Sequence, residues 1–440
     1  MNKAVSYHFT GIKGTGMSAL ALVLKGSGYT VQGSDVEKHF FTEDGLIEAD
    51  IPIYPFSADN IKPGMTIVLG NAFPDDHPEV LRAKELNNTV IRYHEFLGEW
   101  IKQFTSVAIT GSHGKTSTTG LMSHVLSDNI ETSYLIGDGT GCGVKGSEYF
   151  VLEADEYREH FLAYHPDYAI FTNIDFDHPD FYHNIEQVYD ANRQFAEQVK
   201  KKVIAYGDDP LLARFRDLRD IWYYGFSDDD DITAKNITRD TTGSAFDVYV
   251  KDDYYGRFHI HQFGDHNILN SLAVIAFCYF EGFPAQVVAE SFKTYHGVKR
   301  RFNERVVGSN VVIDDYAHHP QEIKATIQAA RQEYPDRKLV AIFQPHTYSR
   351  TKALLTAFAG ALDHADEAYL CEIFASAREQ DHHEVSSQDI IEKMTIPSQL
   401  LMMDGVEALL AYDHAVLLFM GAGDVMKYAH HYEELLATKN

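Results

Sequence analysis

Gly111-Ser112-His113-Gly114-Lys115-Thr116-Ser117-Thr118 lies between a short apolar run at 106–110 and a segment with helical periodicity. A glycine-rich loop between a strand and a helix turns its backbone N–H groups inward, and the helix N-terminus adds positive potential. The lysine of such a loop reaches the outer phosphates of a nucleotide, and the threonine hydroxyl can hold Mg²⁺. The longer form of this motif needs glycine where the chain has Ile109, so only the shorter GxxGKT form is present. We therefore predict a nucleoside triphosphate site on a parallel sheet.

Acidic and amide side chains follow the next two predicted strands of the same sheet. Glu153-Ala154-Asp155-Glu156 comes after the run at 149–152, and Asn173-Ile174-Asp175-Phe176-Asp177-His178 comes after the run at 168–171. The carboxyl ends of parallel strands are where α/β sheets place their ligands, and carboxylate oxygens suit Mg²⁺. We predict that Glu153 or a neighbouring carboxylate holds Mg²⁺ directly or through water.

A second glycine-rich turn, Gly11-Ile12-Lys13-Gly14-Thr15-Gly16, follows the predicted strand at 6–10. Its glycines have the order GxxGxG, which differs from the GxGxxG of dinucleotide-binding domains. A tight turn at a helix N-terminus still suits a diphosphate. Asp35, about 20 residues further on, is placed to bind a ribose hydroxyl, as in Rossmann domains.

The last third of the chain carries two polar groups after predicted strands at 311–314 and 339–343. These are Asp314-Asp315-Tyr316-Ala317-His318-His319-Pro320 and Gln344-Pro345-His346-Thr347-Tyr348-Ser349-Arg350. Histidine, tyrosine and arginine at neighbouring strand ends suit a small carboxylate, which Arg350 can bind in a bidentate pair. Arg300-Arg301, just before this region, is placed to clamp a phosphate from a closing domain.

The strand–glycine–helix pattern restarts three times, which predicts an α/β protein of three domains. The length of 440 residues agrees with about 150 residues per domain. We expect a Rossmann-like domain at 1–103, a central domain at 104–298 and a second Rossmann-like domain at 299–440. In the central domain the run at 203–206 is expected to close the parallel strands, and an antiparallel appendage is expected from Ile221 to about Phe263.

Composition excludes several classes of function. Lys and Arg number 38 against 64 Asp and Glu, a formal net charge of −26. This balance argues against a protein that binds nucleic acid non-specifically or docks on anionic lipid. The three cysteines, Cys142, Cys278 and Cys371, show no paired spacing and fit a reducing compartment. No apolar run approaches the ~20 residues that span a bilayer, so we expect a cytoplasmic protein without a membrane partner.

These motifs occur together in the order found in the Mur ligases, the ATP-dependent amide-forming enzymes of peptidoglycan synthesis. Gly264-Asp265-His266-Asn267, with Asn270, and Arg300-Arg301-Phe302 add to the resemblance, which covers essentially the whole chain. The loop at 11–18 and the group at 315–320 are similar to the member that uses L-alanine. The resemblance implies that ATP converts the carboxylate of UDP-N-acetylmuramate to an acyl phosphate, which the amine of L-alanine attacks.

The resemblance also implies roles for residues at matching positions. The catalytic residues would be Lys115, Glu153, His178 and His318. ATP would be bound by Gly111, Ser112, His113, Gly114, Lys115, Thr116, Ser117, Asn267, Asn270, Arg301 and Asp315. The UDP-sugar would be bound by Gly14, Thr15, Gly16, Met17, Asp35 and Asn71, and L-alanine by Tyr316, His318, His346 and Arg350. Thr116, Glu153 and His178 would hold Mg²⁺, with Mn²⁺ as an alternative ion.

The chain departs from the family pattern at two places, and other readings stay open. Thr347 stands where many members have arginine, and no lysine follows His178 at the distance of the carbamylated lysine of several relatives, Arg193 lying closest. The alternative within the family is a murein-recycling ligase that adds a tripeptide to the same nucleotide. Alternatives outside it are an NAD-dependent oxidoreductase and a P-loop switch or motor protein. We expect a monomer or a weak dimer.

Overall fold

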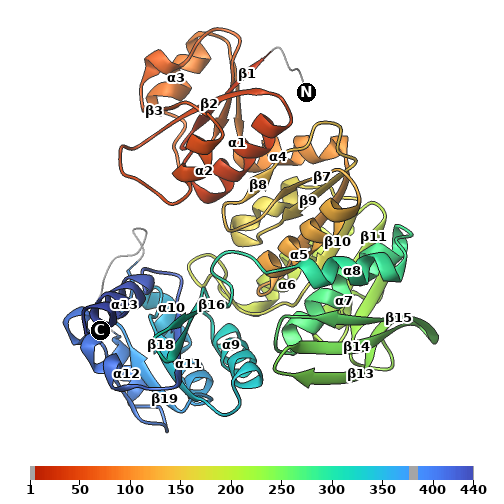
Figure 1. Ribbon diagram of the computed structural model, residues 1–440. Helices are drawn as coiled ribbons and strands as arrows, with labels where there is room; N and C mark the ends of the chain where they lie inside the picture. The colour runs from red at the N-terminus through yellow and green to blue at the C-terminus, as the bar shows by residue number, and fades with distance from the viewer. Residues whose placement is uncertain (1–4, 376–384, 440) are drawn as a thin grey trace.

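The computed structural model describes residues 5–375 and 385–439, which form three α/β units along the chain (Figure 1). The first unit is a five-stranded parallel sheet with the order β3-β2-β1-β4-β5. Its strands are β1 (Ser6–Thr10), β2 (Thr30–Asp35), β3 (Ile53–Pro55), β4 (Thr66–Leu69) and β5 (Thr89–Arg92). Its helices are α1 (Thr15–Gly26), α2 (Glu43–Glu48), α3 (Pro78–Glu85) and α4 (Tyr93–Trp100), with 3₁₀ turns η1 (Ala58–Asn60) and η2 (Ile101–Gln103).

The central unit is a ten-stranded sheet with the order β15-β14-β13-β12-β11-β10-β6-β9-β7-β8. Its strands are β6 (Thr105–Thr110), β7 (Thr132–Leu135), β8 (Gly141–Cys142), β9 (Tyr149–Glu153), β10 (Tyr168–Phe171), β11 (Lys202–Tyr206), β12 (Ile221–Gly225), β13 (Ile232–Asp240), β14 (Gly243–Val250) and β15 (Asp253–Ile260). Its helices are α5 (Lys115–Asn129), α6 (Ile185–Glu197), α7 (Asp265–Phe280) and α8 (Ala285–Thr294), with η3 (Tyr157–Ala163) and η4 (Leu212–Phe215).

The antiparallel part of this sheet begins later than the sequence predicts. β12 pairs with β11 in parallel, Val203 opposite Ile221, and β13 continues the sheet in parallel with β12 before β14 and β15 turn antiparallel. The predictions that β11 closes the parallel run and that the appendage starts at Ile221 are therefore wrong. The reason is that the acidic loop between β12 and β13 carries the chain onward without reversing it, so the hairpins extend the main sheet.

The third unit is a six-stranded sheet with the order β16-β17-β21-β18-β19-β20. Its strands are β16 (Asn303–Val307), β17 (Asn310–Asp315), β18 (Lys338–Phe343), β19 (Glu367–Leu370), β20 (Ser398–Leu400) and β21 (Ala415–Met420). Its helices are α9 (Pro320–Glu333), α10 (Tyr348–Ala353), α11 (Leu355–Leu362), α12 (Ser387–Ile391) and α13 (Met426–Lys439), with η5 (Met403–Ala411). The predicted strands at 311–314 and 339–343 are present as β17 and β18, and the antiparallel edge strand β16 was not predicted.

The first and central units share one buried hydrophobic cluster, which runs from Tyr7 and Trp100 to Phe150 and Phe171. Helix α1 reaches β8 so closely that a Cβ on Gly141 would lie 2.0 Å from the carbonyl oxygen of Ala19. The third unit has its own cores. No helix within the described ranges is both long and apolar enough to cross a bilayer. The domain boundaries at 103/104 and 298/299 stay predictions.

Gln332 on α9 connects the third unit to the central unit through hydrogen bonds. Its Nε2 donates to the carbonyl oxygen of Gly243 at 2.9 Å, and the backbone N–H of Gly264 donates to its Oε1 at 2.9 Å. The glycine-rich loop after β6 and the polar segment after β17 line one cavity between these two units, and Arg350, after β18, bonds to Asp177 of the central unit.

Candidate active site

The loop between β6 and α5 has a backbone conformation that requires glycine at two positions. Gly111 and Gly114 have φ of 122° and 86°, and a Cβ on Gly111 would lie 2.3 Å from Thr172 Oγ1. Asn173, at the end of β10, brackets His113. The His113 N–H donates to Asn173 Oδ1 at 2.9 Å, and Asn173 Nδ2 donates to the His113 carbonyl oxygen at 2.9 Å. The neighbouring strand end thus holds the loop in place.

Lys115 is turned back onto its own loop and onto a buried carboxylate. Its Nζ donates to the carbonyl oxygen of Gly111 at 2.7 Å and to Glu156 Oε2 at 2.9 Å. Burial disfavours the charge of this lysine, but the carboxylates of Glu156, Asp155 and Glu153 outweigh burial and raise the pKa of Lys115. The lysine is therefore a permanent cation at the mouth of the loop.

Two groups of oxygen and nitrogen donors lie where the sequence predicts Mg²⁺. The hydroxyl of Thr116 contributes to holding the charged form of Glu153, whose pKa is nevertheless raised, chiefly by burial. Asp155, Glu156 and His178 form the second group, with ligand atoms all within 4.8 Å of one another.

These donors fit a hard divalent cation. Glu156 is 1% exposed, and its Oε1 has no hydrogen-bond partner among the described residues. His178 Nε2 stands 3.8 Å from that oxygen and from Asp155 Oδ1, too far for hydrogen bonds. A cation placed among these atoms would satisfy groups that burial leaves unpaired. Arg193, which lies closest to the expected position of the relatives' carbamylated lysine, donates hydrogen bonds to Asp217 and Glu197.

A cavity of about 980 Å³ lies between the central and third units. Residues that the sequence predicts to bind ATP line it from both sides: His113, Gly114, Ser117, Asn267, Asn270, Arg301 and Asp315. Asn270 at the start of α7 approaches the loop closely, its Oδ1 lying 3.1 Å from where a Cβ on Gly114 would be. The structure therefore brings seven of the eleven predicted ATP-binding residues, from two domains, to one cavity.

Glu322 on α9 organises the third-domain side of this cavity. Its Oε2 accepts the backbone N–H of His318 at 3.0 Å, and its Oε1 lies 3.7 Å from Arg301 Nη1 and 3.6 Å from His113 Nδ1. Burial opposes the charge of this carboxylate, but these cationic neighbours outweigh burial and hold its pKa well below the ordinary value. Asp315 accepts the N–H groups of Ala317 and Phe302, and burial raises its pKa to about 6.

The residues predicted to bind the amino acid gather beside this cavity. His318 Nδ1 lies 3.0 Å from the carbonyl oxygen of Tyr316, which can only accept, so Nδ1 carries the hydrogen and Nε2 is left as an acceptor. Burial lowers the pKa of His318 to about 3 and keeps the ring neutral. The rings of His318 and His346 lie 6.2 Å apart. Arg350 is paired with Asp177 of the central domain.

The first domain presents the predicted UDP-sugar residues at the carboxyl ends of β1, β2 and β4. Gly14 caps α1, and Thr15, Gly16 and Met17 begin it. Asp35 Oδ2 accepts the backbone N–H of Lys13 at 2.7 Å, so the acidic side chain braces the glycine-rich loop. Asn71 lies between two histidines. Its Oδ1 is 3.0 Å from His94 Nδ1, and its Nδ2 is 3.1 Å from His160 Nδ1.

Three contacts of the site were not predicted from the sequence. Glu156 holds Lys115, Asp177 holds Arg350, and Glu322 touches both domains. Glu156 and Asp177 lie in the polar segments after β9 and β10, in which the sequence predicts roles by name only for Glu153 and His178. Glu322 has one local signal, because it stands three residues after the helix-capping His319 and completes a capping box.

Models of protein families match the three parts of the chain. "Mur ligase family, catalytic domain" matches residues 6–105, "Mur ligase middle domain" matches 109–278, and "Mur ligase, glutamate ligase domain" matches 300–426. Two relatives carry the name UDP-N-acetylmuramate–L-alanine ligase. The one from Levilactobacillus brevis is 54% identical over 437 residues, 99% of this chain and 98% of that protein. The one from Lactiplantibacillus plantarum is 54% identical over 434 residues, 99% of each chain.

Solved structures show the same fold. UDP-N-acetylmuramate-alanine ligase from Thermotoga maritima superimposes with a TM-score of 0.80 at 28% identity, covering 99% of this chain and 100% of that one. A murein peptide ligase from Psychrobacter arcticus has a TM-score of 0.70 at 22% identity, covering 98% of each chain. The predicted three-domain α/β architecture is confirmed.

Proposed function

This chain belongs to the Mur ligase family, and on that premise we propose that it joins L-alanine to the carboxylate of UDP-N-acetylmuramate at the expense of ATP. One structural observation supports this proposal independently of the names of the relatives. The phosphate-loop lysine, the group around His178 and the amino-acid residues His318 and Arg350 converge where the central and third domains meet. A carboxylate, a triphosphate and an amine can meet there.

In the first step, the muramate carboxylate attacks the γ-phosphate of ATP, the bond to ADP breaks, and an acyl phosphate forms. Carboxylate and triphosphate repel each other, so the site must supply positive charge where they meet. Lys115 provides a fixed cation for this purpose, and exchanges its contact with Glu156 for phosphate oxygens. Mg²⁺, held by Thr116 and Glu153 and beside His178, would supply further positive charge to the phosphates.

In the second step, the neutral amine of L-alanine attacks the acyl carbon, and the tetrahedral intermediate expels phosphate to leave an amide. Arg350 would bind the alanine carboxylate while it keeps Asp177 as a neighbour. The neutral ring of His318 offers Nε2 as a hydrogen-bond acceptor for the amine. Tyr316 and His346, whose rings lie beside that of His318, would complete the wall around the amino acid.

Acyl phosphates hydrolyse in water, so the junction must close over the intermediate. Arg301 and Asp315 reach the nucleotide cavity from the third domain, which supports closure of that domain over ATP. The UDP-sugar would enter from the first domain, at the loop around Gly14 and Asn71. A UDP-sugar and ATP as substrates support a cytoplasmic enzyme, which we propose to act as a monomer or weak dimer.

Mass spectrometry of the product tests this proposal. Incubation with ATP, Mg²⁺, UDP-N-acetylmuramate and either L-alanine or the murein tripeptide should yield a nucleotide-linked product only with L-alanine. A product with the tripeptide alone would overturn the proposal in favour of the recycling ligase. In a parallel incubation with NAD added, reduction of NAD without any adduct would overturn it in favour of an oxidoreductase.

A further inference from the structure

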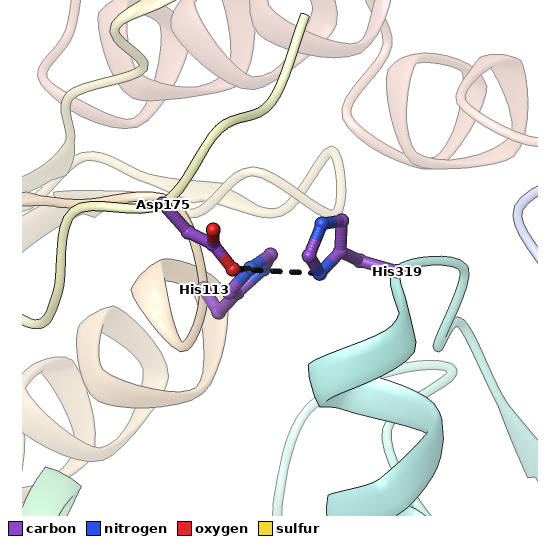
Figure 2. A group of neighbouring side chains, drawn as sticks. All are labelled: His113, Asp175 and His319. Atoms are coloured by element: carbon purple, nitrogen blue, oxygen red, sulfur yellow. Dashed lines mark hydrogen bonds and ion pairs between the residues drawn. The ribbon is translucent and has the colours of Figure 1, made fainter. Parts of the chain in front are cut away.

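Two histidines and a carboxylate from two domains meet at the edge of the nucleotide cavity (Figure 2). His113 comes from the phosphate loop, Asp175 follows β10, and His319 caps α9 of the third domain. His113 Nε2 lies 3.3 Å from Asp175 Oδ2, and His319 Nδ1 lies 3.8 Å from the same oxygen. One ligand atom from each side chain falls within 4.8 Å of the others. The centroids of the two imidazole rings lie 4.3 Å apart, and the ring planes are tilted by 31°.

The group is buried but incompletely satisfied. The His319 side chain is 5% exposed, and its Nε2 has no hydrogen-bond partner within the part of the chain that the structure describes. Its Nδ1, the nitrogen measured toward Asp175, accepts a weak 3.4 Å contact from the Gln321 N–H. Asp175 is 36% exposed, which leaves a path for an ion or water. Burial works against a charge on His113, but Asp175 and Glu322 outweigh burial and raise the pKa of His113 to about 9. Burial lowers the pKa of His319 to about 4.

We propose that His113, Asp175 and His319 form a binding site for a divalent transition ion of the Zn²⁺ class, with two ligands from the central domain and one from the third. Two imidazole nitrogens and one carboxylate are ligands typical of Zn²⁺, whereas Mg²⁺ prefers sites in which oxygen ligands predominate. Glu322 Oε1, 3.6 Å from His113 Nδ1, would fix the tautomer that leaves Nε2 to the ion. Water would complete the coordination.

Such an ion would join the two domains that must separate to release products. Binding therefore predicts inhibition of turnover, with the ion stabilising the arrangement in which the junction is closed. The binding itself does not depend on the proposed ligase activity, so the two can fail separately. The site is distinct from the Asp155–Glu156–His178 group, whose donors include two carboxylates.

The direct test is equilibrium dialysis of the full-length protein against Zn²⁺ with excess Mg²⁺ and no nucleotide. The variant is His319→Asn, because asparagine is a good helix cap and replaces the weak 3.4 Å acceptor for the Gln321 N–H without supplying an imidazole. Wild-type protein should bind one Zn²⁺ more than this variant. Exposed His183→Asn is the matched control and should match the wild type. Circular dichroism checks that each variant is folded.

Cobalt gives a second readout that needs no activity. Co²⁺ at the site should produce visible absorption typical of nitrogen ligation, which His319→Asn loses and His183→Asn keeps. Unchanged metal stoichiometry and spectrum in His319→Asn would overturn the proposal. If His178→Asn loses the extra ion instead, the proposal is also overturned, because the ion would then belong to the Asp155–Glu156–His178 group.

Inhibition is measured after binding is known. Each protein is compared with its own metal-free rate of phosphate release, and Zn²⁺ should inhibit the wild type at concentrations about tenfold or more below those that inhibit His319→Asn. Equal sensitivity would overturn the claim that the ion restrains domain separation. If neither protein turns over, the proposed ligase function fails, and the dialysis result still decides the metal site.

Discussion

Arg350 of the third domain donates a hydrogen bond from Nη2 to Asp177 Oδ1 of the central domain at 2.5 Å, and both side chains are more than nine-tenths buried. Burial would raise the pKa of Asp177, but Arg350 and His178 outweigh burial and lower it. Asp177, which is next to the predicted metal ligand His178, therefore positions Arg350, which is predicted to bind the carboxylate of the amino acid. The predicted metal ligand His178 and the predicted amino-acid site are thus linked through one ion pair across the junction.

We predict that Asp177→Asn weakens L-alanine binding selectively. A hydrogen bond to a charged group contributes roughly 1.5–3 kcal/mol, so KM for L-alanine should rise about 10- to 100-fold while KM for ATP changes little. Steady-state kinetics with each substrate varied in turn measure both constants. The matched control is Asp217→Asn, which breaks the exposed pair with Arg193 and should leave both constants unchanged. An equal rise in both KM values would contradict a positioning role for Asp177.

We predict that Lys115→Met removes phosphoryl transfer without unfolding the protein. Loss of one preorganised charge contact in a buried site lowers kcat by about 10²–10³-fold. Rapid-quench measurement of ADP formation isolates this step. Lys102→Met, at a surface lysine paired with Glu99, is the control and should retain wild-type rates. ADP formation at wild-type rate in Lys115→Met would show that the loop does not act on the γ-phosphate.

The central loop was predictable because its chemistry is contiguous in sequence. Residues 111–118 form one segment, and the strand before them and the helix after them set their direction. Strand ends at Glu153 and Asn173 were predictable for the same reason, since parallel strands bring their carboxyl ends to one edge. The four main strands of the third domain are similarly clear as buried apolar runs.

What the sequence could not show is how the domains dock. Asp177 and Arg350 are 173 residues apart, and His113 meets Glu322 and His319 only because the third domain lies against the central one. The hydrophobic periodicity of a segment predicts the secondary structure of that segment and not its contacts with a distant domain. The misplaced start of the antiparallel strands has a related cause, because partner direction depends on the path of the loop between β12 and β13 and not on either strand alone.

We predict that Glu79 makes the first domain sensitive to acid. This fully buried carboxylate accepts hydrogen bonds from Thr10 and Ser34 and contacts His8. Burial alone would raise its pKa, but these partners outweigh burial and lower it to about 2. A folded-state pKa below the unfolded one stabilises at neutral pH, by about 3 kcal/mol here, and that contribution is lost as pH falls from about 5 towards 2.

The test compares the wild type with Glu79→Gln by urea unfolding, both in a Trp222→Phe background where Trp100 of the first domain is the reporter. The difference in unfolding free energy should shrink by about 1 kcal/mol at pH 4 and about 2 kcal/mol at pH 3 relative to pH 7. Exposed Glu85→Gln on the same helix should show no such trend. A pH-independent difference would contradict the depressed pKa.

We predict that Thr347→Gly stabilises the third domain. Thr347 has φ of 69° and ψ of 141°, a backbone region that a β-branched residue rarely adopts. Strain of this kind costs roughly 1–3 kcal/mol, and the extra chain entropy of glycine offsets roughly 0.5–1 kcal/mol of the relief. A net gain of about 1 kcal/mol should appear as a higher thermal midpoint. Thr351→Gly, inside α10, should instead lower it.

The most direct measurement of the central claim is phosphate release with ATP, Mg²⁺ and UDP-N-acetylmuramate, with and without L-alanine. An amide-forming ligase turns over only when every substrate is present, so we expect sustained release with L-alanine and none beyond a single turnover without it. Lys115→Met should abolish both signals. Sustained phosphate release without any amino acid would contradict the ligase function and identify the chain as a nucleotide hydrolase.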